Sequence, residues 1–171
     1  MTQATQVSRA VFGFDPGPRT GLAAYLVGDR QISLMGAYSP DDLLPTLDRL
    51  IPSFDVVAFS VEDWENYGRR PGFSANLPNR VIGLLQGYAY TRGIAVHMHP
   101  PSRWKRSFSK NVSPIAFKGL GVKDRTILSR LIMECGGGVL DLVRALSRDD
   151  LPHAVDAAGV AVYGAMALGI H

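Results

Sequence analysis

The sequence predicts an α/β domain with a mixed sheet. Three short apolar runs near the N-terminus are separated by turn residues, a pattern typical of antiparallel hairpins. After them, helical and strand-like segments alternate, which indicates parallel strands joined by helices. The chain has 171 residues, of which 46% are hydrophobic and 19% charged. That length and composition predict one soluble domain, residues 1–171, with a sizeable core.

The first half of the chain supplies four of the expected strands. The first three are expected at 10–15, 20–27 and 31–38, because the turn sequences PGPRT and GDR separate these apolar runs. Ser39 then precedes a proline and two aspartates, the pattern of a helix N-terminus, and leucines follow at helical spacing. The fourth strand, 55–62, is almost entirely apolar, which predicts burial on both faces.

The second half alternates helices with one more strand. A helix is expected at 79–92, a fifth strand at 94–98, an irregular basic segment at 99–121, and helices at 123–135, 139–146 and 152–168. Three consecutive glycines end the first of these last three helices, and a proline in its first turn favours the start of the third.

Basic residues are concentrated in one stretch of the chain. Residues 92 to 130 contain nine of the 18 lysines and arginines but only one acidic residue, Asp124. Positive charge gathered in this way, with few acids beside it, is the pattern expected of a protein that binds a polyanion. The sequence therefore favours a nucleic-acid partner over a merely solvated basic surface.

Four polar residues lie where their segments would converge. Asp15 and Glu62 each end a strand-like run, and His153 and Asp156 lie one turn apart on the last helix. Strand alternation favours Glu62 over Asp63 as the inward carboxylate. Three carboxylates and an imidazole suit divalent ions such as Mg²⁺ or Mn²⁺, which support phosphodiester hydrolysis. The alternatives are a turn cap for Asp15 and an ordinary core or surface position for His153.

Three motifs, in this order, resemble the RuvC family of Holliday junction resolvases, within the ribonuclease H-like nuclease superfamily. They are FGFDPGPRTG at the first strand, SVED at the end of the fourth and HAVDAAGVAVYGA on the last helix. The resemblance implies a ribonuclease H-like five-stranded mixed sheet flanked by helices. It also implies a crossover junction endodeoxyribonuclease that acts on branched DNA as a homodimer, with two divalent cations in each active site.

By this resemblance, Asp15, Glu62 and Asp156 match the catalytic carboxylates of the family. His153 stands where many members have aspartate, which lowers the charge of the site by one and leaves the choice between Mg²⁺ and Mn²⁺ open. The helix expected at 79–92 matches the one through which the family dimerises, although an apolar stripe of this kind is more often core.

Eight further residues are candidates for contact with DNA. The segment 63–76 is rich in glycine, arginine and aromatic residues, which suits stacking on unpaired bases and holding phosphates. The alternative is that Trp64 and Phe73 only anchor this loop on the protein. In the basic stretch, the candidates for stabilising the scissile phosphate, or for plain contact with the DNA backbone, are Lys105, Lys118 and Lys123. The eight are Trp64, Tyr67, Arg69, Arg70, Lys105, Lys110, Lys118 and Lys123.

Three other functions are compatible with parts of this pattern. A less selective phage-like nuclease, acting on flaps or replication intermediates, would use the same site. A catalytically idle junction-binding module would keep only the basic surface, and the three intact carboxylates argue against it. An actin-like ATPase or sugar kinase lobe also has an Asp-Pro-Gly motif, but those proteins need two lobes and this chain is too short for both.

The compartment is predicted from what the sequence lacks. Cys135 is the single cysteine, so no intrachain disulfide is possible. The N-terminal residues have no signal-like apolar core, and no uncharged apolar run approaches the ~20 residues of a spanning helix. We expect a soluble, cytoplasmic protein without a membrane partner.

Overall fold

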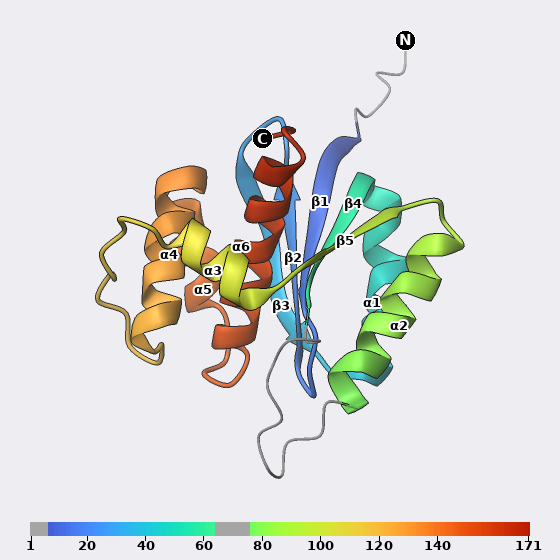
Figure 1. The fold of residues 1–171 in the computed structure, drawn as a ribbon, viewed down its shortest axis with the longest axis horizontal. Coiled ribbons are helices and arrows are strands. Elements are labelled where there is room, and N and C mark those ends of the chain that lie inside the picture. Colours follow the sequence, from blue (N-terminus) through green and yellow to red (C-terminus); the bar gives the residue numbers. More distant parts are fainter. Residues whose placement is uncertain (1–6, 64–75) are drawn as a thin grey trace.

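The computed structural model describes residues 7–63 and 76–171. One five-stranded sheet, in the order β3-β2-β1-β4-β5, lies between two helical layers (Figure 1). Its strands are β1 (Ser8–Asp15), β2 (Thr20–Leu26), β3 (Gln31–Tyr38), β4 (Phe54–Glu62) and β5 (Ala95–His99). The pairs β1–β2 and β2–β3 are antiparallel, whereas β1–β4 and β4–β5 are parallel. The expected mixed α/β sheet is confirmed.

The helices divide between the two faces of this sheet. They are α1 (Pro40–Leu50), the 3₁₀ turn η1 (Ile51–Ser53), α2 (Asn76–Tyr90), α3 (Pro101–Phe108), α4 (Val122–Cys135), α5 (Gly138–Arg144) and α6 (Leu151–Ala167). Helices α1 and α2 cover one face, with Leu43 and Leu85 packed on phenylalanines of β1 and β4. Helix α6 covers the other face, and α3, α4 and α5 lie outside it (Figure 1). Within the described residues, no helix is both long and apolar enough to cross a membrane.

The prediction of an irregular segment over 99–121 is wrong for its first part, because Pro101–Phe108 forms α3. Pro101 is suited to the first turn of a helix, and Trp104 and Phe108 recur one turn apart and are buried. The remaining α3 side chains are mostly polar and exposed. The helix is therefore amphipathic, and it places an aromatic stripe against α4 and α6.

Helix α2 also differs from its prediction. It begins at Asn76 rather than at residue 79. Leu85 and Tyr88 of its apolar stripe are buried within the chain, so this part of the stripe belongs to the core and is not free for an interface. Leu84 and Tyr90 remain 42% and 87% exposed.

Glycines let α6 lie directly on the sheet. A Cβ atom on Gly13 would be 2.1 Å from the carbonyl oxygen of Ala157, and one on Gly21 would be 2.0 Å from that of His153. No side chain fits at such distances, so both positions require glycine. Because Gly21 is the register partner of Asp15 on the neighbouring strand, this contact holds the N-terminal part of α6 beside Asp15.

Candidate active site

The carboxylates of two neighbouring strands meet at one edge of the sheet. Asp15 ends β1 and Glu62 ends β4, and these strands are parallel partners, so their carboxyl ends lie side by side. Asp15 is 5% exposed and Glu62 is 1% exposed. Asp63, the next residue, lines a different pocket with α2, on the opposite face of the sheet. Of the two carboxylates, Glu62 is the one that lies beside Asp15, and its role as a metal ligand stays a prediction.

Helix α6 brings a third carboxylate to the same place. One oxygen each from Asp15, Glu62 and Asp156 lie within 4.8 Å of one another. Burial and the negative charge of Asp15 both raise the pKa of Glu62 and of Asp156 above the ordinary carboxyl range. Packing three buried acids this closely is therefore unfavourable unless cations are present.

The donor set fits a divalent cation. All three groups are carboxylates, the ligands preferred by Mg²⁺ and tolerated by Mn²⁺. The Oδ1 atom of Asp156 is buried and has no hydrogen-bond partner in the described protein. A buried acceptor without a donor is costly, and a bound cation would satisfy it.

Lys105 of α3 partly neutralises these acids. Its Nζ lies 2.5 Å from Asp156 Oδ2 and 3.3 Å from Glu62 Oε2. Burial disfavours the charged ammonium, but the charges of Asp156 and Glu62 outweigh burial and raise the pKa of Lys105 above its ordinary value. Lys105 is therefore cationic, and it competes with any other cation for two of the three carboxylates.

Trp104 was not identified from the sequence as part of the site. Its indole Nε1–H donates a hydrogen bond to Glu62 Oε2 at 3.0 Å, and the whole side chain is buried. Gly159 on α6 leaves room for the indole ring, since a Cβ there would be 2.8 Å from the ring. Its position directly before Lys105, a candidate residue, could have identified it. Trp104 was missed because this segment was expected to be irregular, so no orientation was predicted for its side chains.

His153 contacts Asp15. Its Nδ1 lies 2.8 Å from Asp15 Oδ2. The hydrogen bond to Asp15 raises the pKa of His153, and burial opposes this only in part. Neither ring nitrogen of His153 belongs to the group of ligand atoms that lie within 4.8 Å of one another. Its role as a metal ligand stays a prediction, while its position at the site agrees with the motif.

Asp124 adds a further acid near the cluster. It lies in the first turn of α4, where burial raises its pKa although the charge of Lys105 opposes this rise. Its charge interacts with those of Asp15 and Asp156. In the sequence, Asp124 is the single acidic residue among the basic residues 92–130. Its unusual place there was the one feature that could have identified it as a candidate site residue.

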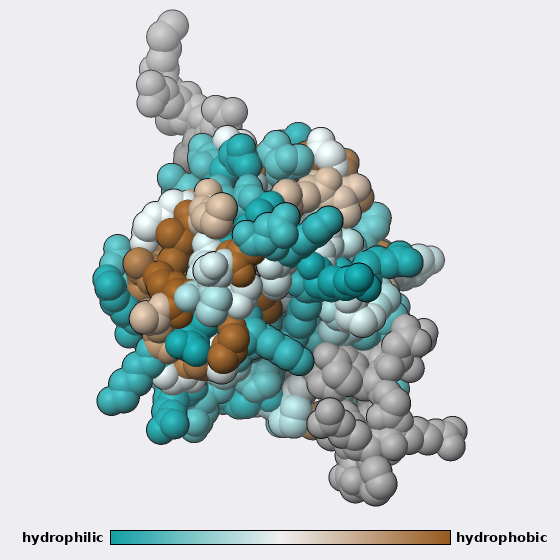
Figure 2. Space-filling view, turned by 60° about the vertical axis from the view of Figure 1, so that its left-hand side comes forward, coloured by the Kyte–Doolittle hydropathy of each residue, from teal (hydrophilic) through white to brown (hydrophobic). Residues whose placement is uncertain are grey.

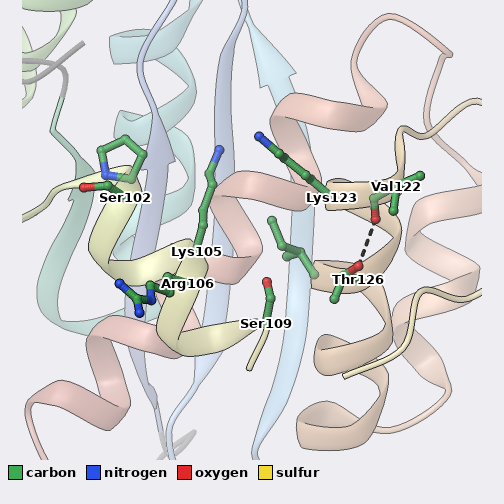
Figure 3. A pocket seen from close by; sticks show the side chains of 9 residues that line it. Ser102, Lys105, Arg106, Ser109, Val122, Lys123 and Thr126 are labelled. Carbon is green, nitrogen blue, oxygen red and sulfur yellow. Dashed lines mark hydrogen bonds between the residues drawn. The ribbon is translucent and has the colours of Figure 1, made fainter. Parts of the chain in front are cut away.

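The candidate DNA contacts fall into three groups. Trp64, Tyr67, Arg69 and Arg70 lie outside the described residues. Lys110 and Lys118 are exposed on the segment that joins α3 to α4, and Lys105 and Lys123 line a pocket between these helices (Figure 3). Of the four lysines, Lys105 alone is ion-paired to the acidic cluster.

Two solved structures are similar to this chain over nearly its whole length. One is Thermus thermophilus RuvC in complex with a Holliday junction substrate, with a TM-score of 0.64, 19% sequence identity, and coverage of 93% of this chain and 94% of that chain. The other is Thermus thermophilus RuvC, with a TM-score of 0.60, 18% identity, and coverage of 94% and 97%. No family model and no curated protein matches the sequence. The chain therefore has the same fold as these RuvC structures, with the five-stranded mixed sheet flanked by helices that the resemblance implied.

Proposed function

We propose that this protein is a metal-dependent, structure-selective endodeoxyribonuclease that hydrolyses phosphodiester bonds in Holliday junctions and other branched DNA. The observation that carries the proposal is the convergence of Asp15, Glu62 and Asp156 at one edge of the sheet. The shared fold supports it, because one similar structure is a RuvC protein bound to a Holliday junction.

The carboxylates would hold Mg²⁺ or Mn²⁺, two ions in each site, and bound ions would activate water and stabilise the leaving oxygen. The protein residues would do the rest. Trp104 fixes one oxygen of Glu62, and His153 fixes one of Asp15. Lys105 supplies a positive charge next to the carboxylates, where it would contact the scissile phosphate.

The basic residues would bind the DNA backbone. Three exposed lysines follow Lys105 in the chain between α3 and the first turn of α4. They are Lys110, Lys118 and Lys123. We extend the proposal to Trp64, Tyr67, Arg69 and Arg70. Aromatic side chains can stack on the unpaired bases at the centre of a junction, and arginines can hold its phosphates. Counter-ion release from several phosphate contacts would make binding strongly dependent on salt.

The test is a gel assay of one synthetic four-way junction, one flap and one linear duplex, each with Mg²⁺, Mn²⁺ or chelator. We expect junction cleavage with metal and none with chelator. Asp15→Asn keeps the shape of the side chain but removes the charge that a cation needs, so it should abolish cleavage while junction binding survives.

Asp41→Asn is the matched control, because Asp41 is exposed on α1, on the other face of the sheet. It should cut at the wild-type rate. Cleavage by Asp15→Asn at the wild-type rate would refute the site, and flap cutting that exceeds junction cutting would favour the less selective nuclease.

A further inference from the structure

A pocket of about 450 Å³ lies between α3 and α4, and neither the motifs nor the acidic cluster accounts for it. Its apolar walls include Pro101 from α3, and Val122 and Ile127 from α4. Val122 is 61% exposed although it is a large aliphatic residue at the start of a helix. Figure 2 shows apolar surface among hydrophilic side chains on this side of the molecule. The apolar surface is costly to expose unless a ligand covers it.

The pocket adjoins the acidic cluster. Lys105 lines it and at the same time contacts Glu62 and Asp156. In Figure 3 the side chains of Lys105 and Lys123 extend toward the same side of the pocket. A DNA strand with its scissile phosphate at the carboxylates would therefore have an adjacent nucleotide beside this pocket.

The chemistry of the lining selects among possible occupants. Lys105, Arg106 and Lys123 are cationic, and none of the lining residues in the described part of the chain is acidic. The hydroxyl of Ser109 and two further hydroxyls can pair with polar edges of a ligand. An apolar slot with hydroxyls and a cationic rim suits a flat heteroaromatic ring attached to a phosphate.

We propose that the pocket between α3 and α4 receives an unpaired nucleobase of the cut DNA strand, next to the scissile phosphate. The inference rests on the proposed nuclease function and names a subsite for it. Val122 and Pro101 would contact the faces of the base, and Lys123 would hold a flanking phosphate. Unpaired bases at a branch point need little further unstacking before they can enter such a pocket.

The test uses four-way junctions with 2-aminopurine at each position on either side of the cut, one position per junction. Its fluorescence rises when the base leaves the stack. The protein carries Asp15→Asn, so that the DNA stays intact, and it is present at saturating concentration. We expect a several-fold rise at one position, and no rise there when Val122→Glu is added.

Met133→Glu is the matched control, since Met133 is an exposed apolar residue on the same helix and does not line the pocket. It should leave the rise unchanged, and circular dichroism should show both variants folded. A second arm offers the free 2-aminopurine deoxynucleotide. Equal binding of the free nucleotide would mean a mononucleotide site and would overturn the assignment to the DNA strand.

The outcomes separate this inference from the proposed function. If the wild-type protein cuts junctions but no position brightens, or Val122→Glu brightens as much as Met133→Glu, the pocket proposal is wrong and the nuclease stands. If no branched DNA is cut with either metal, the proposed function fails, and the subsite fails with it.

Discussion

At the scale of single residues, Glu62 depends on an unusual donor. The indole of Trp104 binds one of its oxygens inside the core. Trp104→Phe keeps most of the ring packing and removes this hydrogen bond. We expect the Mn²⁺ concentration that half-saturates the site to rise about 10-fold. Hydrogen-bond donors that orient a metal ligand typically contribute 10- to 100-fold to metal affinity.

Calorimetric titration of Mn²⁺ without DNA measures this change directly. Phe108→Leu is the control, because Phe108 packs beside Trp104 in the same helix, and no hydrogen bond joins it to the carboxylates. An unchanged Mn²⁺ affinity in Trp104→Phe would mean that the indole only fills space.

The raised pKa values of Glu62 and Asp156 predict how the metal-free protein responds to pH. Their folded-state pKa lies above the unfolded value of about 4, so the folded state binds more protons between the two values. Stability should therefore fall as pH rises through this window. Thermal unfolding at about pH 5 and about pH 8 measures the loss.

Two further measurements test whether this pH dependence of stability comes from Glu62 and Asp156. Mg²⁺ or Mn²⁺ should recover more stability at the higher pH, where the carboxylates are ionised. Asp156→Asn removes one of the two ionisations and should flatten the pH profile, whereas Asp41→Asn should not. A metal-free protein that keeps or gains stability over this pH range would contradict the raised pKa values of the two carboxyl groups.

At the scale of elements, the strands that end in carboxylates were predictable and α3 was not. β1 and β4 are mostly apolar runs of strand length, so their hydrophobicity alone identifies them in the sequence as buried strands. α3 has only eight residues and begins at the second of two consecutive prolines. Its apolar stripe spans only two turns, so the sequence pattern is difficult to distinguish from that of a loop. Trp104 was therefore assigned to the site only by the structure, which also distinguishes Lys105 from the other candidate lysines by its ion pairs with the carboxylates.

The packing of α6 on β2 leads to a prediction for Gly21. Gly21→Ala would put a methyl group 2.0 Å from the carbonyl oxygen of His153, so α6 must move away from the sheet. We expect a loss of about 1–3 kcal/mol in the free energy of unfolding, in the range of overpacked cores. Gly28→Ala is the control, because nothing lies within 4 Å of a Cβ there. Urea unfolding that shows equal stability for both variants would contradict the close packing.

At the scale of the whole molecule, the sequence predicted the site better than its surroundings. Asp15, Glu62, His153 and Asp156 come together because each lies at a recognisable strand end or helix turn. Asp124 and Lys105 reach the same place through the packing of α3 and α4 on α6. That packing depends on contacts between distant segments, which no local pattern encodes.

The last prediction concerns assembly. Symmetric cutting of a four-way junction needs two equivalent sites related by a two-fold axis, and this chain supplies one. We therefore expect a homodimer, with α2 as the candidate interface. Leu84 and Tyr90 are its large exposed hydrophobic residues, whereas Leu85 and Tyr88 are buried in the core of the chain.

Sedimentation at micromolar concentration, with and without junction DNA, tests this assembly. Leu84→Glu should shift the protein toward monomer and turn paired cuts into single nicks, because an isologous interface would meet the new charge twice. Met133→Glu introduces the same charge at an exposed position of α4, away from α2, and should leave the dimer intact. A wild-type monomer in both conditions would rule out paired incision but not the hydrolytic chemistry, since each acidic cluster is built within one chain.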